Sequence, residues 1–331
     1  MKKIVIFGAT GNLGAYVVDY FLENFDKDKF EIIAVGRRET EFFKKLGIKY
    51  YKVDISKKDM FDILPNEDVY SVVDLAGIMP AQMKGYDPYK YVDINITGTL
   101  NVLEYCRVNN VDRILFTQTE ADLKGYWGKE KIIRPDMTRN FSKKGYYALY
   151  VISKSTAVDL IKNYNEDYGI KAFIFRLPTV YCYKPSPYYY VNGEKKLLGY
   201  RQLIDKAING EDIELWGDPN KAKDIVYVKD FAQMLYKAIL VDKDYGMYNV
   251  GTGKAVTLEE QINGIIEVFS NGEKKSKIIY CPDKPDAREF IMDIENAKKE
   301  LGYKPKYSYI EYLRDFKKEM ELNRFRELRG E

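Results

Sequence analysis

The sequence predicts an α/β fold in which a doubly wound parallel sheet carries a second, smaller mixed α/β region. In the first half of the chain, short and nearly continuous apolar strands alternate with longer helical patterns, as in successive strand–helix–strand units. Strands that are apolar on both faces are typical of a parallel sheet covered by helices on both sides. After Leu177 this alternation weakens, and prolines interrupt a tyrosine-rich stretch at 181–190.

The elements of the first half follow from apolar runs and helical spacing. We expect buried strands at 4–7, 32–35, 50–53, 71–75, 113–117 and 172–176. Helices are expected at about 13–24, 91–109 and 146–167. Together these segments predict a first domain over residues 1–177.

The remainder, 178–331, is predicted to form a smaller region, with some of the chain returning to the first domain. Its expected strands lie at 213–216 and 225–228, and its expected helices at 231–240 and 258–269. The charged ending, 314–331, is interpreted as a solvated terminal helix.

Composition excludes several classes of function. A net charge of +3, from 53 basic and 50 acidic residues, gives no large field for nucleic acid, so we expect no nucleic-acid partner. No apolar run approaches the ~18 residues of a membrane span, and the N-terminal run is too short for a signal peptide. The three cysteines are far apart, which disfavours disulfides and zinc and indicates a reducing, cytoplasmic setting.

The chain contains no histidine, which removes the commonest general base and metal ligand. Proton chemistry must therefore use Tyr, Lys, Asp, Glu or Cys, and we expect no metal.

A glycine-rich turn follows the first strand and opens the first helix. Glycine at such a turn lets the backbone approach a pyrophosphate, whose charge is met by the helix N-terminus. Directly after an N-terminal apolar strand, the pattern predicts dinucleotide binding. The residues of the turn are Gly8, Thr10, Gly11, Asn12, Leu13 and Gly14.

The GxxGxxG spacing of this turn resembles the short-chain dehydrogenase/reductase family, which implies a Rossmann-type NAD(P)-binding domain. Where an acidic residue would hold the ribose 2′-hydroxyl of NAD, this sequence has Arg37 and Arg38. A guanidinium can pair with a phosphate, so NADP is the first choice of cofactor and NAD the second. Two solvent-facing arginines without a ligand are the alternative.

The same resemblance implies further cofactor-binding positions. Asp54 and Ile55 correspond to the pair beside the adenine ring, and Asn95 to a structural asparagine on the central helix. The remaining implied positions lie at strand ends: Leu75, Ala76, Gly77, Thr117 and Pro178.

Tyr150 and Lys154 are four residues apart in a predicted helix and therefore lie on one face. A phenol has a pKa near ~10, too high for a base at neutral pH. A nearby ammonium and an oxidised nicotinamide favour the phenolate. Although 30 tyrosines make a chance spacing possible, this pair follows the fifth strand, as in the family. By the same resemblance Thr119, at the end of that strand, would bond the reacting oxygen.

The second half resembles the extended branch of the family, whose usual substrates are nucleotide sugars. The resemblance rests on Arg176–Tyr181, Trp216–Asp218, Lys223–Asp230, Tyr248–Gly253 and Leu301–Pro305. It implies that 178–331 is a substrate-binding region in which Thr179 contacts the substrate, while Lys223 and Arg288 neutralise its diphosphate. It also implies a homodimer formed through the helices at 91–109 and 146–167.

Several reactions share these residues. A 4,6-dehydratase has Asp-Glu after the threonine, where this chain has Glu120-Ala121, so dehydration is disfavoured. We expect epimerisation through a keto sugar, with an NADPH-dependent 4-keto reductase as the alternative. A sensor that binds dinucleotide without catalysis would typically lack Tyr150 or Lys154, and both are present.

Overall fold

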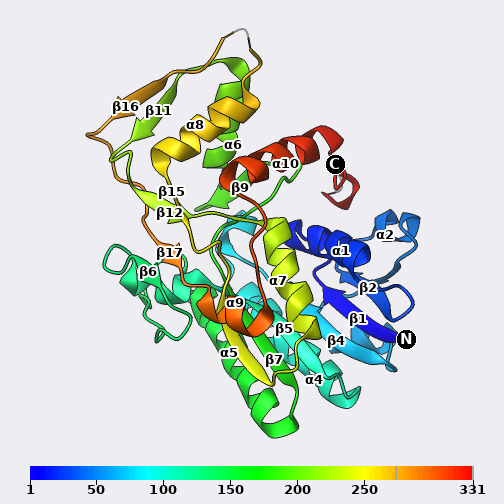
Figure 1. Cartoon of the computed structure of the whole chain (residues 1–331). Coiled ribbons are helices and arrows are strands. Elements are labelled where there is room, and N and C mark those ends of the chain that lie inside the picture. The colour runs from blue at the N-terminus through cyan, green and yellow to red at the C-terminus, as the bar shows by residue number, and fades with distance from the viewer. Residues whose placement is uncertain (273, 330–331) are drawn as a thin grey trace.

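A computed structural model describes residues 1–272 and 274–329, and its centre is a parallel sheet. Within these residues the sheet has seven strands in the order β14-β7-β5-β4-β1-β2-β3, and every neighbouring pair is parallel. Figure 1 shows the sheet with helices on either side. The strands are β1 (Lys2–Phe7), β2 (Phe30–Gly36), β3 (Lys49–Lys52), β4 (Val69–Asp74), β5 (Arg113–Thr119), β7 (Lys171–Leu177) and β14 (Tyr245–Asn249).

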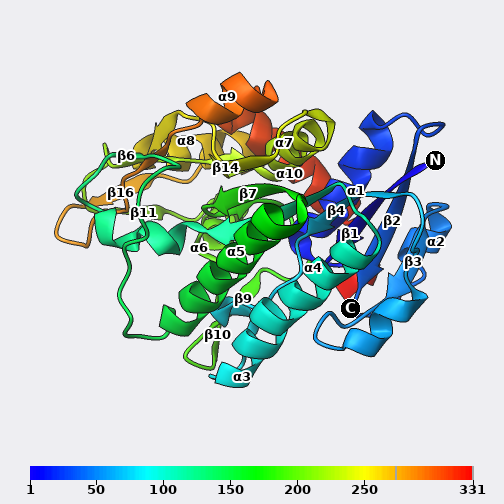
Figure 2. The same ribbon diagram turned by 90° about the horizontal axis from the view of Figure 1, so that it is seen from below.

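The two faces of the sheet bury different helices, because side chains alternate along each strand. In β1, Val5 and Phe7 belong to one apolar core, which includes residues of α4 (Gly98–Val108) and α5 (Ala148–Tyr168). Ile4 and Ile6 belong to the other core, with residues of α1 (Asn12–Asn24) and α7 (Val228–Leu240). Figure 2 shows α4 and α5 side by side on one face of the sheet.

The helix expected at 91–109 is divided, which corrects that prediction. A short turn, α3 (Pro88–Lys90), leads into a π-helical segment, η3 (Tyr91–Thr97), and only then into α4. Asn95 lies inside the π-helical segment, with its side chain hydrogen-bonded to the backbone of Ile78. Wide turns of this kind occur where tertiary contacts outweigh regular helix geometry, which periodicity alone does not reveal.

The second region forms a separate lobe in Figure 1, with small two-stranded sheets and helices. The chain then returns to the main sheet, because α7 packs on it and β14 pairs with β7. The other elements after β7 are β8 (Val180–Tyr181), β9 (Tyr188–Val191), β10 (Glu194–Leu197), α6 (Gly199–Asn209), β11 (Ile213–Trp216), β12 (Ala222–Asp224), β13 (Val226–Tyr227), β15 (Ala255–Thr257), α8 (Leu258–Phe269), β16 (Ile278–Cys281), β17 (Ile291–Met292), α9 (Glu295–Leu301) and α10 (Tyr309–Leu322). Of these, α9 packs on α7 and β14 rather than in the lobe.

The C-terminal segment differs from the solvated helix that the sequence predicts. Helix α10 begins at a capping box on Ser308 and ends at Asn323, and its Phe316 is fully buried. Beyond it, Phe325 is buried against Tyr16 of α1, with ring centroids 4.7 Å apart. The many charged residues of this segment obscure, in the sequence, the apolar residues that the fold buries. Residues 330–331 lie outside the described residues.

Among the described residues, no helix combines the length and apolar character needed to cross a membrane.

Candidate active site

The glycine turn joins β1 to α1 and provides a close backbone surface. Gly8 has φ +76°, and a Cβ there would lie 2.7 Å from the carbonyl carbon of Leu75. A Cβ on Gly14 would lie 2.2 Å from the carbonyl oxygen of Gly8. The first turn of α1 contains no acidic side chain that would oppose an anion. The turn therefore fits a pyrophosphate held by backbone N–H groups.

Arg37 and Arg38 are exposed directly after β2. One of them already has a protein partner, because the guanidinium of Arg38 donates to the carbonyl of Leu328 at 2.8 Å. Thr10 packs beside Gly36 at the same edge of the sheet. The two arginines therefore differ in their availability to a ligand.

Asp54 and Ile55 form a turn after β3. The carboxylate of Asp54 accepts hydrogen bonds from the backbone and hydroxyl of Ser56, and Ile55 is buried against Gly98 of α4. Asn101 of α4 donates to the carbonyl of Ile55 at 2.8 Å. The turn is thus held by helix α4.

The loop after β4 contains Leu75, Ala76 and Gly77, and Asn95 holds its continuation. The amide of Asn95 accepts from the backbone N–H of Ile78 at 2.9 Å and donates to the carbonyl of Ile78 at 3.0 Å. It also donates to the Ser153 hydroxyl at 3.0 Å. Asn95 therefore links the loop to the helix that carries Tyr150 and Lys154.

Thr119, Tyr150 and Lys154 converge at the carboxyl end of β5. Thr119 is its last residue, and α5 carries the other two one helical turn apart. The Thr119 side chain lies close enough to Tyr150 to lower the pKa of its phenol. The Lys154 ammonium lies 3.8 Å from the ring centroid of Phe116. The structure thus brings together the three residues predicted to be catalytic.

Two implied cofactor positions border this cluster. Thr117 is partly buried in β5, two residues before Thr119. Pro178 is buried immediately after β7, the neighbouring strand. Both therefore lie at the edge where the parallel strands end.

Burial controls the electrostatics of the cluster. It raises the pKa of Tyr150, and the charge of Glu120 adds to this increase, whereas the hydrogen bond from Thr119 opposes it. Burial lowers the pKa of Lys154 to about 8, although the charge of Asp74 acts against this shift. The residues of the chain alone therefore favour the neutral phenol. Formation of the phenolate requires an added positive charge beside Tyr150.

A cavity of about 220 Å³ adjoins the cluster and is lined by Glu120, Thr179, Lys223 and Arg288, among others. Glu120 connects the two, since Thr119 donates a long hydrogen bond of 3.5 Å to its carboxylate. Burial raises the pKa of Glu120 to about 7, while Arg288 lowers it. The structure thus brings Thr179, Lys223 and Arg288, three of the four residues predicted to contact the substrate, into one cavity.

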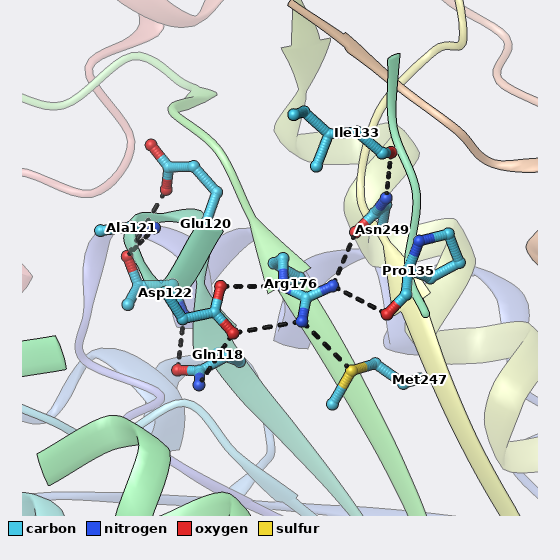
Figure 3. A network of polar contacts seen from close by, with 10 residues as sticks. Gln118, Glu120, Ala121, Asp122, Ile133, Pro135, Arg176, Met247 and Asn249 are labelled. Carbon is cyan, nitrogen blue, oxygen red and sulfur yellow. Dashed lines mark hydrogen bonds and ion pairs between the residues drawn. The ribbon is translucent and has the colours of Figure 1, made fainter. Parts of the chain in front are cut away.

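A buried ion pair below the end of β5 was not found from the sequence. Arg176 of β7 pairs with Asp122 through two hydrogen bonds of 3.0 and 3.1 Å, and both side chains are fully buried. Figure 3 shows the guanidinium between Asp122, Asn249 and the carbonyl of Pro135. Asp122 lies three residues after Thr119, so this pair fixes the segment that carries Thr119 and Glu120. The sequence contains no local signal for it, because the partners are 54 residues apart.

A family model described as the NAD dependent epimerase/dehydratase family matches residues 4–251, about three quarters of the chain. The chain belongs to this family. The matched segment contains the glycine turn, Thr119, Tyr150, Lys154 and Lys223, and it ends two residues after β14. The resemblance to the extended short-chain dehydrogenase/reductases is thereby confirmed, and a nicotinamide dinucleotide is the cofactor of the family.

Individual relatives are similar along nearly the whole chain. A UDP-glucuronate 4-epimerase of Thermodesulfobacterium geofontis is 26% identical over 325 residues, covering 95% of this chain and 94% of the relative. UDP-glucuronic acid decarboxylase 3 of Arabidopsis thaliana is 25% identical over 316 residues, covering 92% and 84%. The crystal structure of the UDP-glucose 4-epimerase of Thermus thermophilus in complex with NAD has a TM-score of 0.72 at 20% identity, covering 98% and 99%. This structural likeness confirms the predicted Rossmann-type fold.

Proposed function

We propose that this protein epimerises a nucleotide-linked sugar by transient oxidation to a keto sugar. The proposal rests mainly on one observation: Thr119, Tyr150 and Lys154 lie together at the carboxyl ends of the strands. The glycine turn lies at the same edge of the sheet, and a cavity lined by two cationic side chains adjoins the cluster. In open parallel sheets, ligands bind at this edge.

The residues divide the work as follows. Tyr150 accepts the proton of a sugar hydroxyl, and Thr119 donates a hydrogen bond to the oxygen as it becomes a carbonyl. Lys154 lies one turn from Tyr150, and a positive charge beside the phenol would favour the phenolate when the cofactor is bound. When bound, the dinucleotide supplies the acceptor and donor of hydride. Epimerisation requires the hydride to return to the opposite face of the sugar carbon.

Lys223 and Arg288 would bind the diphosphate of the substrate, with Thr179 beside them. Arg288 lies over the ring of Trp127 at 4.5 Å, which orients its planar guanidinium. The named relatives act on uridine diphosphate sugars, which supports UDP as the nucleotide.

We keep NADP as the first choice of cofactor and NAD as the second. Arg37 and Arg38 favour a 2′-phosphate, and neither residue directly after Gly36 is acidic. Against this, Arg38 is bonded to Leu328, and the Thermus thermophilus relative is complexed with NAD. Dissociation constants for NADH and NADPH, measured by nicotinamide fluorescence, decide between them.

Three organisational features belong to the same proposal. The chain divides at residues 1–177 and 178–331, although α7, β14 and the C-terminal segment around Phe325 pack on the first part. It forms a homodimer through η3, α4 and α5, whose outer surface exposes Val92, Leu100 and Val108. It resides in the cytoplasm. Light scattering of the purified protein tests the dimer, and domain expression tests the division.

The central experiment incubates the purified protein with UDP- and GDP-hexoses and follows sugar configuration by NMR. Epimerisation gives product without net change in absorbance at the NADH wavelength, and Tyr150→Phe is the matched control. Stoichiometric loss of NADPH on a keto sugar would instead identify a reductase.

A further inference from the structure

Strand β4 ends in Asp74, a carboxyl group that the proposed reaction does not use. Asp74 is fully buried, and one of its oxygens, Oδ1, accepts from the backbone N–H of Ala76 at 3.0 Å. Within the described residues, the other oxygen, Oδ2, has no hydrogen-bond partner. A buried carboxylate oxygen without a hydrogen-bond partner lowers the stability of the fold, so its presence here calls for a physical reason.

The register of the sheet places this carboxyl group on the side of Lys154. Asp74 lies opposite Phe116 of β5, and residues in register on neighbouring parallel strands direct their side chains to the same face. The ammonium of Lys154 lies over the ring of that same Phe116 at 3.8 Å. Lys154 is itself only 5% exposed, so water does little to stabilise its charge.

The remaining neighbours of Asp74 leave Lys154 as its cationic counterpart. Helix α4 contributes Cys106, whose thiol pKa is raised by burial and further by the charge of Asp74. The strands on either side contribute Phe7 and Phe116, which carry no charge. Of the described groups that act electrostatically on Asp74, Lys154 is the charged one.

We propose that Asp74 is a positioning residue, whose buried carboxylate keeps the Lys154 ammonium charged over the Phe116 ring, one helical turn from Tyr150. The inference rests on the proposed function for its catalytic meaning, but the electrostatic interaction between Asp74 and Lys154 is present in the cofactor-free chain. In this proposal Asp74 acts through Lys154, without contact to the sugar or to the hydroxyls of Thr119 and Tyr150.

The two titrations agree with this arrangement. Burial raises the pKa of Asp74 to about 6, and Lys154 opposes that increase. Burial lowers the pKa of Lys154 to about 8, and Asp74 opposes that decrease. Both groups are therefore charged between about pH 6 and pH 8, and the ammonium is lost as the pH rises through the pKa of Lys154.

The test measures the titration of Lys154 directly, by competitive labelling with acetic anhydride at a series of pH values and mass spectrometry of the Lys154 peptide. In Asp74→Asn, the pKa of Lys154 falls by at least about one unit, because the opposite charge is gone. Ser71→Ala is the matched control, since it removes a buried, unpartnered hydroxyl from the same strand without changing charge. An unchanged pKa in folded Asp74→Asn overturns the proposal, and Asp74→Ser offers a second neutral side chain if Asn prevents folding.

Activity separates this inference from the proposed function. With a UDP-hexose substrate, the alkaline limb of the kcat profile moves to lower pH in Asp74→Asn by the same amount as the Lys154 titration. A shifted titration in a protein without sugar turnover supports the pairing and rejects the epimerase. Turnover with an unshifted alkaline limb and an unshifted Lys154 titration overturns the role of Asp74 and leaves the epimerase intact.

Discussion

The surfaces of the proposed cofactor site and the proposed sugar site, here called the cofactor side and the sugar side, are formed by different parts of the chain. At the glycine turn the backbone makes the surface, and a single added carbon at Gly14 would meet the backbone 2.2 Å away. In the cavity, long side chains from separate segments make the surface, and Arg288 and Thr179 are exposed. Positions where the backbone approaches this closely accept few residue types. Cationic side chains that line an open cavity can be replaced by other residues without disturbing the backbone. The cofactor side should therefore fail abruptly on substitution, and the sugar side gradually.

The largest effect is expected at the junction of the two sides. Tyr150→Phe removes the proposed base but keeps the ring, so kcat falls by roughly 10² to 10⁴, a range typical of general acid–base catalysis. NADH affinity and the melting temperature should stay within error of wild type, measured by fluorescence titration and calorimetry. Full turnover in this variant would reject the mechanism.

Gly14→Ala tests the abrupt failure of the cofactor side. Its Cβ must displace the carbonyl of Gly8, and overpacking of this kind costs about 1–3 kcal/mol. We expect loss of NADH binding and a lowered melting temperature. Gly85→Ala is the control, because a Cβ there meets nothing within 4 Å. Equal NADH binding by both variants would contradict the backbone argument.

Lys223→Ala and Arg288→Ala test the gradual response of the sugar side. Each removes one charge from the cavity, and hydrogen bonds to charged groups contribute about 1.5–3 kcal/mol. The KM for the nucleotide sugar should rise roughly 10- to 100-fold, with NADH affinity unchanged. Lys284→Ala, an exposed cation over Trp216 instead, serves as control. A weakened NADH affinity would show that the two sides are not separate.

Glu120→Gln should give the smallest effect, a shift in pH dependence. The charge of Glu120 raises the pKa of Tyr150, so its removal lowers that pKa. Because Tyr150 acts as the phenolate in the proposed mechanism, the acidic limb of the kcat profile moves to lower pH, by about one unit or less. A pH–rate profile checks this, and a shift to higher pH would mean that Glu120 itself donates or accepts the proton.

The two sides also differ in how far the sequence revealed them. The glycine turn and the Tyr150–Lys154 pair depend on short spacings, which fix local geometry whatever surrounds them. Thr179, Lys223 and Arg288 could be named through family resemblance, but periodicity contains no sign that three such distant segments share a cavity.

The sequence by itself determined the parallel sheet, the turn after β1 and the shared helical face of Tyr150 and Lys154. The spacing of apolar residues and short motifs depends only on the local geometry of one element. The tertiary structure decided the Arg176–Asp122 pair, the placement of Asp74 on the Lys154 side of the sheet, the π-helical segment at Tyr91–Thr97 and the burial of Phe325. Each of these depends on partners from separate elements, whose proximity exists only after the sheet has formed.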